Sequence, residues 1–125
     1  AAGTSTAALV FGGSEIPGNV SKTESYNGTN WTEVNDLNTA RVSLAGSGTQ
    51  TAALAFGGTP PNTGKTEEWN GVSWAETSDL NVARNVLGGV GTSTASLAFG
   101  GTPPVGGQTE EWNIPATTVK TISTD

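Results

Sequence analysis

The stretch that decides the fold is Leu54-Ala55-Phe56-Gly57-Gly58 together with Thr66-Glu67-Glu68-Trp69-Asn70. Both segments return 43 residues later, as Leu97-Ala98-Phe99-Gly100-Gly101 and Thr109-Glu110-Glu111-Trp112-Asn113. A looser copy stands earlier, as Leu9-Val10-Phe11-Gly12-Gly13 and Thr23-Glu24-Ser25-Tyr26-Asn27. A period in the 40s with short apolar runs predicts a propeller or a solenoid. A unit of this size cannot bury its faces alone, so the copies are expected to stack on one another.

The composition fits an ordered but polar repeat protein. Hydrophobic residues make up 34% of the chain, and 18 Gly and 6 Pro bring it near the range of disordered sequences. The glycines recur at fixed places beside aromatic residues, which favours order. The net charge is −6 and the five basic residues stand singly. Binding to nucleic acid or to an anionic membrane surface is therefore disfavoured.

The ends and the missing residue types add three expectations. The chain has no Cys, so disulfides and thiolate metal sites are excluded. No apolar run approaches the length of a membrane span, and no signal peptide is predicted. The sequence begins at Ala1 in mid-repeat and contains no Met. We interpret it as a processed product or as a piece of a longer protein.

Each repeat divides into four short predicted strands. In the second copy they cover about Val42 to Gly48, Thr51 to Phe56, Lys65 to Trp69 and Ser73 to Thr77. Asn70-Gly71 is a two-residue hairpin signal between the last two. The second strand is continuously apolar and the third is more polar, so we expect the former to lie deeper. Four antiparallel strands of this kind predict an all-β fold made of propeller blades.

The spacing of these residues resembles the kelch repeat. In that family an apolar strand ends in Gly-Gly, an aromatic residue and then a Trp follow, and an Arg precedes the next inner strand. The matching residues of the three copies are Phe11, Gly12, Gly13, Tyr26, Trp31 and Arg41; Phe56, Gly57, Gly58, Trp69, Trp74 and Arg84; and Phe99, Gly100, Gly101 and Trp112. In the third copy Thr117 stands where the second Trp is expected. The copies are nearly identical and rich in Thr, Asn and Gly, and in this they are also similar to kelch-like repeats in phage and marine microbial surface proteins.

The resemblance implies about three kelch-like blades in a single domain. Blade 1 covers about residues 1–40 and is expected to lack its inner strand; blade 2 covers about 41–83 and blade 3 about 84–125. Propellers close with four to eight blades. The ring is therefore expected to be completed by association of copies of this chain, with a dimer favoured, or by sequence outside it. The alternating segment Thr118–Ile122 is predicted as the outer strand of blade 3, or as a strand supplied to a partner.

The repeated charged residues are interpreted as structural. Neighbouring residues on a strand point to opposite faces, so Glu67 and Glu68 cannot flank one substrate bond. The pair also recurs as Glu110 and Glu111, whereas an active site is usually unique. Arg41 and Arg84 are expected to pair with a carboxylate such as Asp36, Asp79 or Glu67. The alternative is that they bind an anion or a sugar.

The candidate ligand-binding residues lie in loops and on aromatic positions. The loops between the second and third strands differ most between copies, and they contribute Glu15, Asn19, Asn62 and Thr63. The four Trp residues are expected to pack in the core, with Trp31 and Trp74 the more exposed pair and a possible platform for sugars. No catalytic residue, metal ligand or cofactor site is predicted, because the chain has no His and no phosphate-binding or dinucleotide motif.

These observations favour a non-enzymatic structural or interaction module. It would be a propeller assembled from repeated chains, on a virion or an extracellular surface, with other copies, glycans or surface proteins as partners. The alternative is a lectin-like propeller that binds carbohydrate through its loops. An enzyme on the same scaffold is disfavoured, since a copper oxidase site would need His or Cys ligands.

Overall fold

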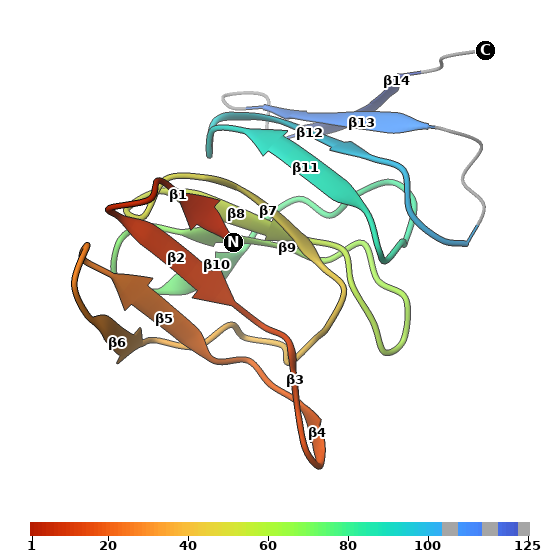
Figure 1. Cartoon of the computed structure of the whole chain (residues 1–125). Helices are drawn as coiled ribbons and strands as arrows, with labels where there is room; N and C mark the ends of the chain where they lie inside the picture. The colour runs from red at the N-terminus through yellow and green to blue at the C-terminus, as the bar shows by residue number, and fades with distance from the viewer. Residues whose placement is uncertain (104–107, 114–117, 123–125) are drawn as a thin grey trace.

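The structure, a computed structural model, describes residues 1–103, 108–113 and 118–122. These residues form strands and no helix, so the prediction of an all-β fold is confirmed. The strands build three four-stranded sheets and one two-stranded hairpin (Figure 1). Every pairing is antiparallel.

Each large sheet is made by one copy of the repeat, and its strands follow one another in sequence order. The first contains β1 (Ala2–Gly3), β2 (Ala8–Phe11), β5 (Thr23–Tyr26) and β6 (Trp31–Val34). The second contains β7 (Ala45–Gly48), β8 (Ala53–Phe56), β9 (Thr66–Trp69) and β10 (Trp74–Glu76). The third contains β11 (Gly88–Gly91), β12 (Ala95–Phe99), β13 (Thr109–Asn113) and β14 (Thr118–Ile122). The hairpin of β3 (Ser14–Glu15) and β4 (Gly18–Asn19) is inserted between β2 and β5.

The first sheet corrects one expectation, because it does have an inner strand. Residues Ala2 and Gly3 pair with Leu9 and Ala8. The residues before β2 were judged too few for a strand, but the tight turn between β1 and β2 takes up only Thr4 to Ala7. Thr4 N–H donates to the Ala7 carbonyl at 2.8 Å, which leaves β1 free to pair. The same turn closes the second sheet, where Thr49 N–H donates to the Ala52 carbonyl at 2.8 Å.

The third sheet ends in β14, at the place expected for an outer strand. Thr118 to Ile122 pair with β13 of the same chain, which agrees with the prediction of an outer strand rather than a strand given to a partner. Thr117, where the resemblance expects Trp, lies outside the described residues.

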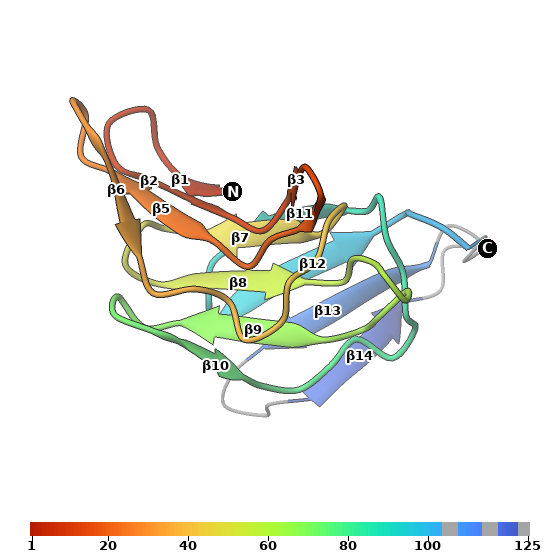
Figure 2. The same ribbon diagram turned by 90° about the horizontal axis from the view of Figure 1, so that it is seen from below.

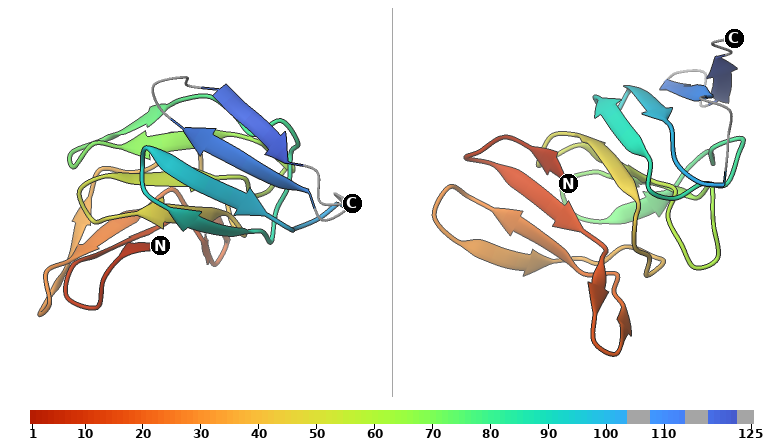
Figure 3. Two further views of the ribbon diagram at one scale, coloured as in Figure 1. Left: turned by 90° about the horizontal axis from the view of Figure 1, so that it is seen from above. Right: turned by 45° about the vertical axis from the view of Figure 1, so that its right-hand side comes forward.

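The three sheets lie one after another, with the second between the other two (Figure 3). Their first strands β1, β7 and β11 contact one another in that order, while the outer strands spread apart (Figure 2). One buried cluster fills the space between the first and second sheets, and it includes Leu9, Phe11, Leu37, Ala53, Ala55, Trp69 and Trp74. A second cluster fills the space between the second and third sheets, with Ala45, Leu54, Phe56, Leu80, Ala98 and Trp112. The two interfaces are therefore built in the same way.

A Phe ring packed over a glycine marks both interfaces. A Cβ added at Gly46 would stand 2.4 Å from the Phe11 ring, and one added at Gly89 would stand 2.3 Å from the Phe56 ring. Real Cβ atoms do not come this close, so the strand facing each ring needs a residue without a side chain. Phe11 and Phe56 are buried as a result, with 4% and 3% of their surface exposed.

Candidate functional site

The two arginines are buried between sheets, as the sequence predicts. The Arg41 Nη1 donates to the carbonyl oxygens of Gly57 and Lys65 at 2.7 Å each. Its Nη2 donates to Glu67 Oε2 at 3.0 Å, and both side chains are almost fully buried. Burial lowers the pKa of Arg41 because it disfavours the charged form, while the charge of Glu67 opposes that shift.

Arg84 repeats this arrangement in the third sheet. Its Nη1 donates to the carbonyls of Gly100 at 3.1 Å and Gln108 at 3.0 Å, and its Nη2 to Glu110 Oε2 at 2.6 Å. Arg84 and Glu110 are both fully buried. Among the proposed partners of the arginines, Glu67 is therefore correct, and Glu110 is its counterpart.

The arginines also join consecutive sheets. The Arg41 carbonyl accepts from Gly13 N–H of the first sheet at 2.9 Å, although its guanidinium is bound by the second. In the same way the Arg84 carbonyl accepts from Gly58 N–H at 2.8 Å. Each connecting segment is thus held by the sheet that it leaves and by the sheet that it enters.

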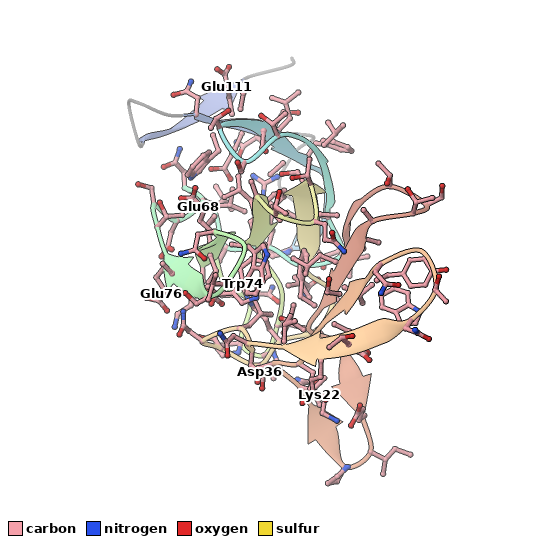
Figure 4. The ribbon with its side chains drawn as sticks, turned by 90° about the vertical axis from the view of Figure 1, so that its left-hand side faces the viewer. Lys22, Asp36, Glu68, Trp74, Glu76 and Glu111 are labelled. Carbon is pink, nitrogen blue, oxygen red and sulfur yellow. The ribbon has the colours of Figure 1, made fainter. Side chains whose placement is uncertain are left out.

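The prediction of an exposed tryptophan pair is wrong for Trp74. Its ring lies between the first two sheets, 4.9 Å from the Phe11 ring and 5.3 Å from the Trp69 ring (Figure 4). The Trp74 Nε1 donates to Thr23 Oγ1 at 3.0 Å, and 6% of the residue is exposed. Trp31 holds the same register position in the first sheet, opposite Tyr26 as Trp74 is opposite Trp69. Trp31 remains 51% exposed because no other described sheet lies against it.

The structure therefore has two open sheet faces, one at each end. The first-sheet face consists of Val10, Glu24, Tyr26, Trp31 and Glu33. A hollow of about 300 Å³ on it is lined by Val10, Glu24 and Trp31. The rings of Tyr26 and Trp31 lie 4.8 Å apart.

The third-sheet face consists of Val90, Leu97, Phe99 and Glu111. Phe99 is 42% exposed and Leu97 36%, although their counterparts Phe56 and Leu54 are buried. A hollow of about 270 Å³ lies beside them, lined by Val90, Gly91, Ala95, Ser96, Leu97 and Glu111. Figure 4 shows Glu111 at the top of the molecule, well apart from the first sheet. The two faces thus lie on different repeats, and each combines exposed apolar side chains with glutamates.

The four loop residues proposed for ligand binding do not form one site. Glu15 and Asn19 stand on the β3–β4 hairpin, where Glu15 pairs with Lys22 at 3.3 Å. Asn62 and Thr63 stand between β8 and β9, and both hold that loop in place. The Asn62 Oδ1 accepts from the Asn85 Nδ2 at 2.5 Å. Thr63 N–H donates to Gly58, and its Oγ1 accepts from the Lys65 N–H at 3.1 Å.

A third hollow lies at the outer margin between the first two sheets. It measures about 470 Å³ and is lined by Glu33, Val34, Asn35, Trp69, Gly71 and Val72. Only 3% of Trp69 is exposed, so its ring faces are covered by the core. The Asn35 Nδ2 is also engaged, since it donates to the Val72 carbonyl at 2.7 Å. This hollow therefore offers no open aromatic platform.

The described ranges contain no group of three or more His, Cys, Asp or Glu side chains that could hold a metal ion. Nor do they contain a helix of the length and apolar character needed to cross a lipid bilayer. No protein family model matches the chain, and comparison with curated proteins gives no match either.

The residue that the sequence interpretation passed over is Glu24. It has the same place in Thr23-Glu24-Ser25-Tyr26 as Glu67 has in Thr66-Glu67-Glu68-Trp69, and the register confirms the correspondence. Glu67 is fully buried, whereas Glu24 is exposed. The correspondence could be found in the sequence, although the position 43 residues before Arg41 would lie before Ala1.

Proposed function

We propose that this chain is a non-enzymatic structural module that forms kelch-like propeller blades and associates with copies of itself, head to tail. In this arrangement the third-sheet face of one chain packs on the first-sheet face of the next. Two chains would supply six blades, which lies within the four to eight that close a propeller. The observation that carries the proposal is that the two open faces expose the counterparts of the residues that pack against each other at the two internal interfaces.

The match between the faces follows from the repeat. At both internal interfaces a Leu and a Phe two residues apart, on one sheet, pack against aromatic and small residues on the next. Leu97 and Phe99 are the corresponding pair on the third-sheet face. Tyr26 and Trp31 are the corresponding aromatic residues on the first-sheet face. Contact of this head-to-tail type closes into a ring when the rotation allows it.

Energetics favour covering both faces. Exposed Phe99, Leu97, Val10 and Trp31 form apolar patches of the kind that mark interaction surfaces. Burying a side chain such as Phe99 contributes about 1.5–3 kcal/mol. The first strands of the three sheets, β1, β7 and β11, lie side by side, as inner strands do when the blades of a propeller surround a common axis. We place the assembly on a virion or an extracellular surface, as the acidic composition without Cys or Met favours.

The first test is the solution mass of the 12.5 kDa chain by light scattering on a size-exclusion column. A discrete mass of two chains is expected. Phe99→Asp and Trp31→Asp should each shift the mass toward that of one chain, because each places a charge within the apolar contact. Ile16→Asp is the matched control, since Ile16 is fully exposed on the hairpin and lies on neither face.

Mixing the two variants tests the head-to-tail geometry itself. Phe99→Asp keeps an intact first-sheet face and Trp31→Asp keeps an intact third-sheet face. An equimolar mixture should therefore regain a species of two chains, joined by one interface. A mixture that stays monomeric, or a native chain that is monomeric at every concentration, would refute the proposal.

Carbohydrate binding is the second candidate function. The observation in its favour is Trp31, whose ring is half exposed beside a hollow that also contains Glu24. Trp74 gives no support, because it is buried. A glycan array separates the two functions: saccharide binding that is lost in Trp31→Ala, with no change of mass, would favour the second.

A further inference from the structure

The second and third sheets each contain a complete binding site for an arginine side chain. In both, one guanidinium nitrogen lies between two backbone carbonyl oxygens and the other meets a glutamate. The acceptors are Gly57, Lys65 and Glu67 in the second sheet, and Gly100, Gln108 and Glu110 in the third. Charge-assisted bonds of this geometry are strong and select the planar, forked guanidinium over an ammonium group.

The first sheet has the same acceptors in the same register. Glu24 is paired with Val10 across the strands, as Glu67 is paired with Ala55 and Glu110 with Ala98. Gly12 N–H donates to the Lys22 carbonyl at 3.0 Å, and Gly57 N–H donates to the Lys65 carbonyl at the same distance. The backbone around the carbonyl groups of Gly12 and Lys22 therefore has the same hydrogen-bond pairing as the backbone around those of Gly57 and Lys65.

The Glu24 carboxylate makes no hydrogen bond and no ion pair within 4.0 Å among the described residues. It borders the hollow of about 300 Å³ on the first-sheet face. The nearest cation, Lys22, is held by Glu15 at 3.3 Å. Hydrogen bonding with Glu15 and the charges of Glu15, Glu33 and Glu24 raise the pKa of Lys22. The region around Glu24 is thus rich in negative charge.

The surrounding charges also match those of a filled site. Glu67, Asp79 and Glu76 all favour the charged form of Arg41. The corresponding residues of the first sheet are Glu24, Asp36 and Glu33. Neither arginine of the chain is free to enter, because Arg41 and Arg84 are buried in their own sheets.

The filled sites show what kind of segment brings the arginine. Asn38 N–H donates to Glu67 Oε1 at 2.7 Å, three residues before Arg41. Asn81 N–H donates to Glu110 Oε1 at 2.5 Å, three residues before Arg84. The shared pattern is Asp-Leu-Asn-x-Ala-Arg, with its Leu buried as Leu37 or Leu80. One glutamate therefore receives both a backbone N–H and the guanidinium from the same short segment.

We infer that Glu24, with the carbonyl oxygens of Gly12 and Lys22, forms an unfilled arginine-binding site that takes a polypeptide segment of the type Asp-Leu-Asn-x-Ala-Arg. The ligand class is a guanidinium group presented by a peptide with an Asn three residues before it. Val10 replaces the Ala of the filled sites, so the first-sheet site is narrower by two methyl groups. The site lies within one sheet and does not depend on the association of chains proposed above.

Isothermal titration calorimetry tests this on the full chain. The probe is a synthetic peptide with the sequence of residues 78–84, acetylated and amidated so that its ends carry no charge. Saturable binding is expected, and replacing the peptide's Arg by Lys should weaken it at least about tenfold, because an ammonium cannot make the forked contacts. Glu24→Gln should weaken it by a similar factor. Glu68→Gln is the matched control, since Glu68 lies opposite Leu54 in the second sheet and on neither open face, and it should leave the affinity unchanged.

Three outcomes would overturn the inference: no binding at millimolar peptide, equal affinity for the Arg and Lys peptides, or unchanged affinity in Glu24→Gln. Repeating the titration with Phe99→Asp separates this inference from the proposed association. Peptide binding by a chain that light scattering shows to be monomeric would support the site while contradicting the assembly. Because association covers the first-sheet face, the monomeric Phe99→Asp chain is decisive: no saturable binding by it would contradict the site and leave the association of the native chain standing.

Discussion

Trp31 and Trp74 stand at the same register position of consecutive sheets, yet Trp31 is 51% exposed and Trp74 only 6%. Glu24 and Glu67 form a second such pair, one exposed and one fully buried. The chemistry and the local pairing are alike in each case. What differs is the neighbour: a sheet and a connecting segment cover the face of the second sheet that carries Trp74 and Glu67, whereas none of the described residues covers the same face of the first sheet. Position in the stack, rather than the repeat itself, decides what each residue contributes.

The largest expected effect is at the tryptophans. Trp74→Ala should lower the free energy of unfolding by about 3–5 kcal/mol, the usual range for a large aromatic in a core. Trp31→Ala should cost less than about 1 kcal/mol, because half of its surface is already in solvent. Urea unfolding at a concentration where the chain is monomeric measures both. If Trp74→Ala does not fold, Trp74→Phe provides the comparison. Equal losses of unfolding free energy at the two positions would contradict an arrangement in which a neighbouring sheet covers Trp74 but not Trp31.

The glutamate pair should differ almost as much. Glu67→Gln removes the charge that offsets buried Arg41, and breaking a buried pair costs about 3 kcal/mol or more. Glu24→Gln should change the free energy of unfolding by no more than about 0.5 kcal/mol, as is usual for surface substitutions. The midpoints of chemical denaturation measure the difference. A large loss in Glu24→Gln would mean that Glu24 already has a structural partner.

Two adjacent glycines allow a finer test of the same contrast. A Cβ at Gly89 would meet the buried Phe56 ring at 2.3 Å, and a Cβ at Gly88 would meet the exposed Phe99 ring at 2.5 Å. Gly89→Ala should destabilise by about 1–3 kcal/mol, since a packed ring cannot give way. Gly88→Ala should be close to neutral, because Phe99 can turn into solvent and Ala favours a strand over Gly by roughly 0.5–1 kcal/mol. Thermal unfolding of the two variants side by side measures this, and similar losses would contradict it.

The sequence was informative wherever one repeat could be compared with another. The four strands of the second copy, a carboxylate partner for Arg41 among three candidates that include Glu67, and the outer-strand place of β14 were all predicted from comparison of the copies. Boundaries were less accurate: the segment predicted from Val42 begins as β7 only at Ala45. The left-handed Ser43, with a φ of 58°, interrupts the strand there.

What the sequence could not give was the environment of each copy. All four Trp residues were expected in the core, with Trp74 among the more exposed because it lies next to an Asn-Gly turn, yet the neighbouring sheet covers it as fully as Trp69. Glu24 was not singled out because none of the described residues pairs with it. Both depend on which faces meet, which is a property of the stack and not of any single repeat. The short strand β1 was missed for a different reason, since two residues carry too little pattern to predict a strand.

The smallest expected effect is a gain in stability at Val86, which corresponds in the next repeat to Ser43. Val86 has a φ of 53°, a conformation that costs a β-branched residue about 1–2 kcal/mol and suits Asn better. Its side chain is 67% exposed, so little packing would be lost. Val86→Asn should raise the free energy of unfolding by about 0.5–1 kcal/mol. Val72→Asn is the matched control, because Val72 is 68% exposed but does not have a positive φ. Equal urea midpoints for the two variants would show that the positive φ of Val86 does not destabilise the protein. The conformation at Val86 would then be fixed by the hydrogen bond from its N–H to the Ser43 carbonyl at 2.8 Å.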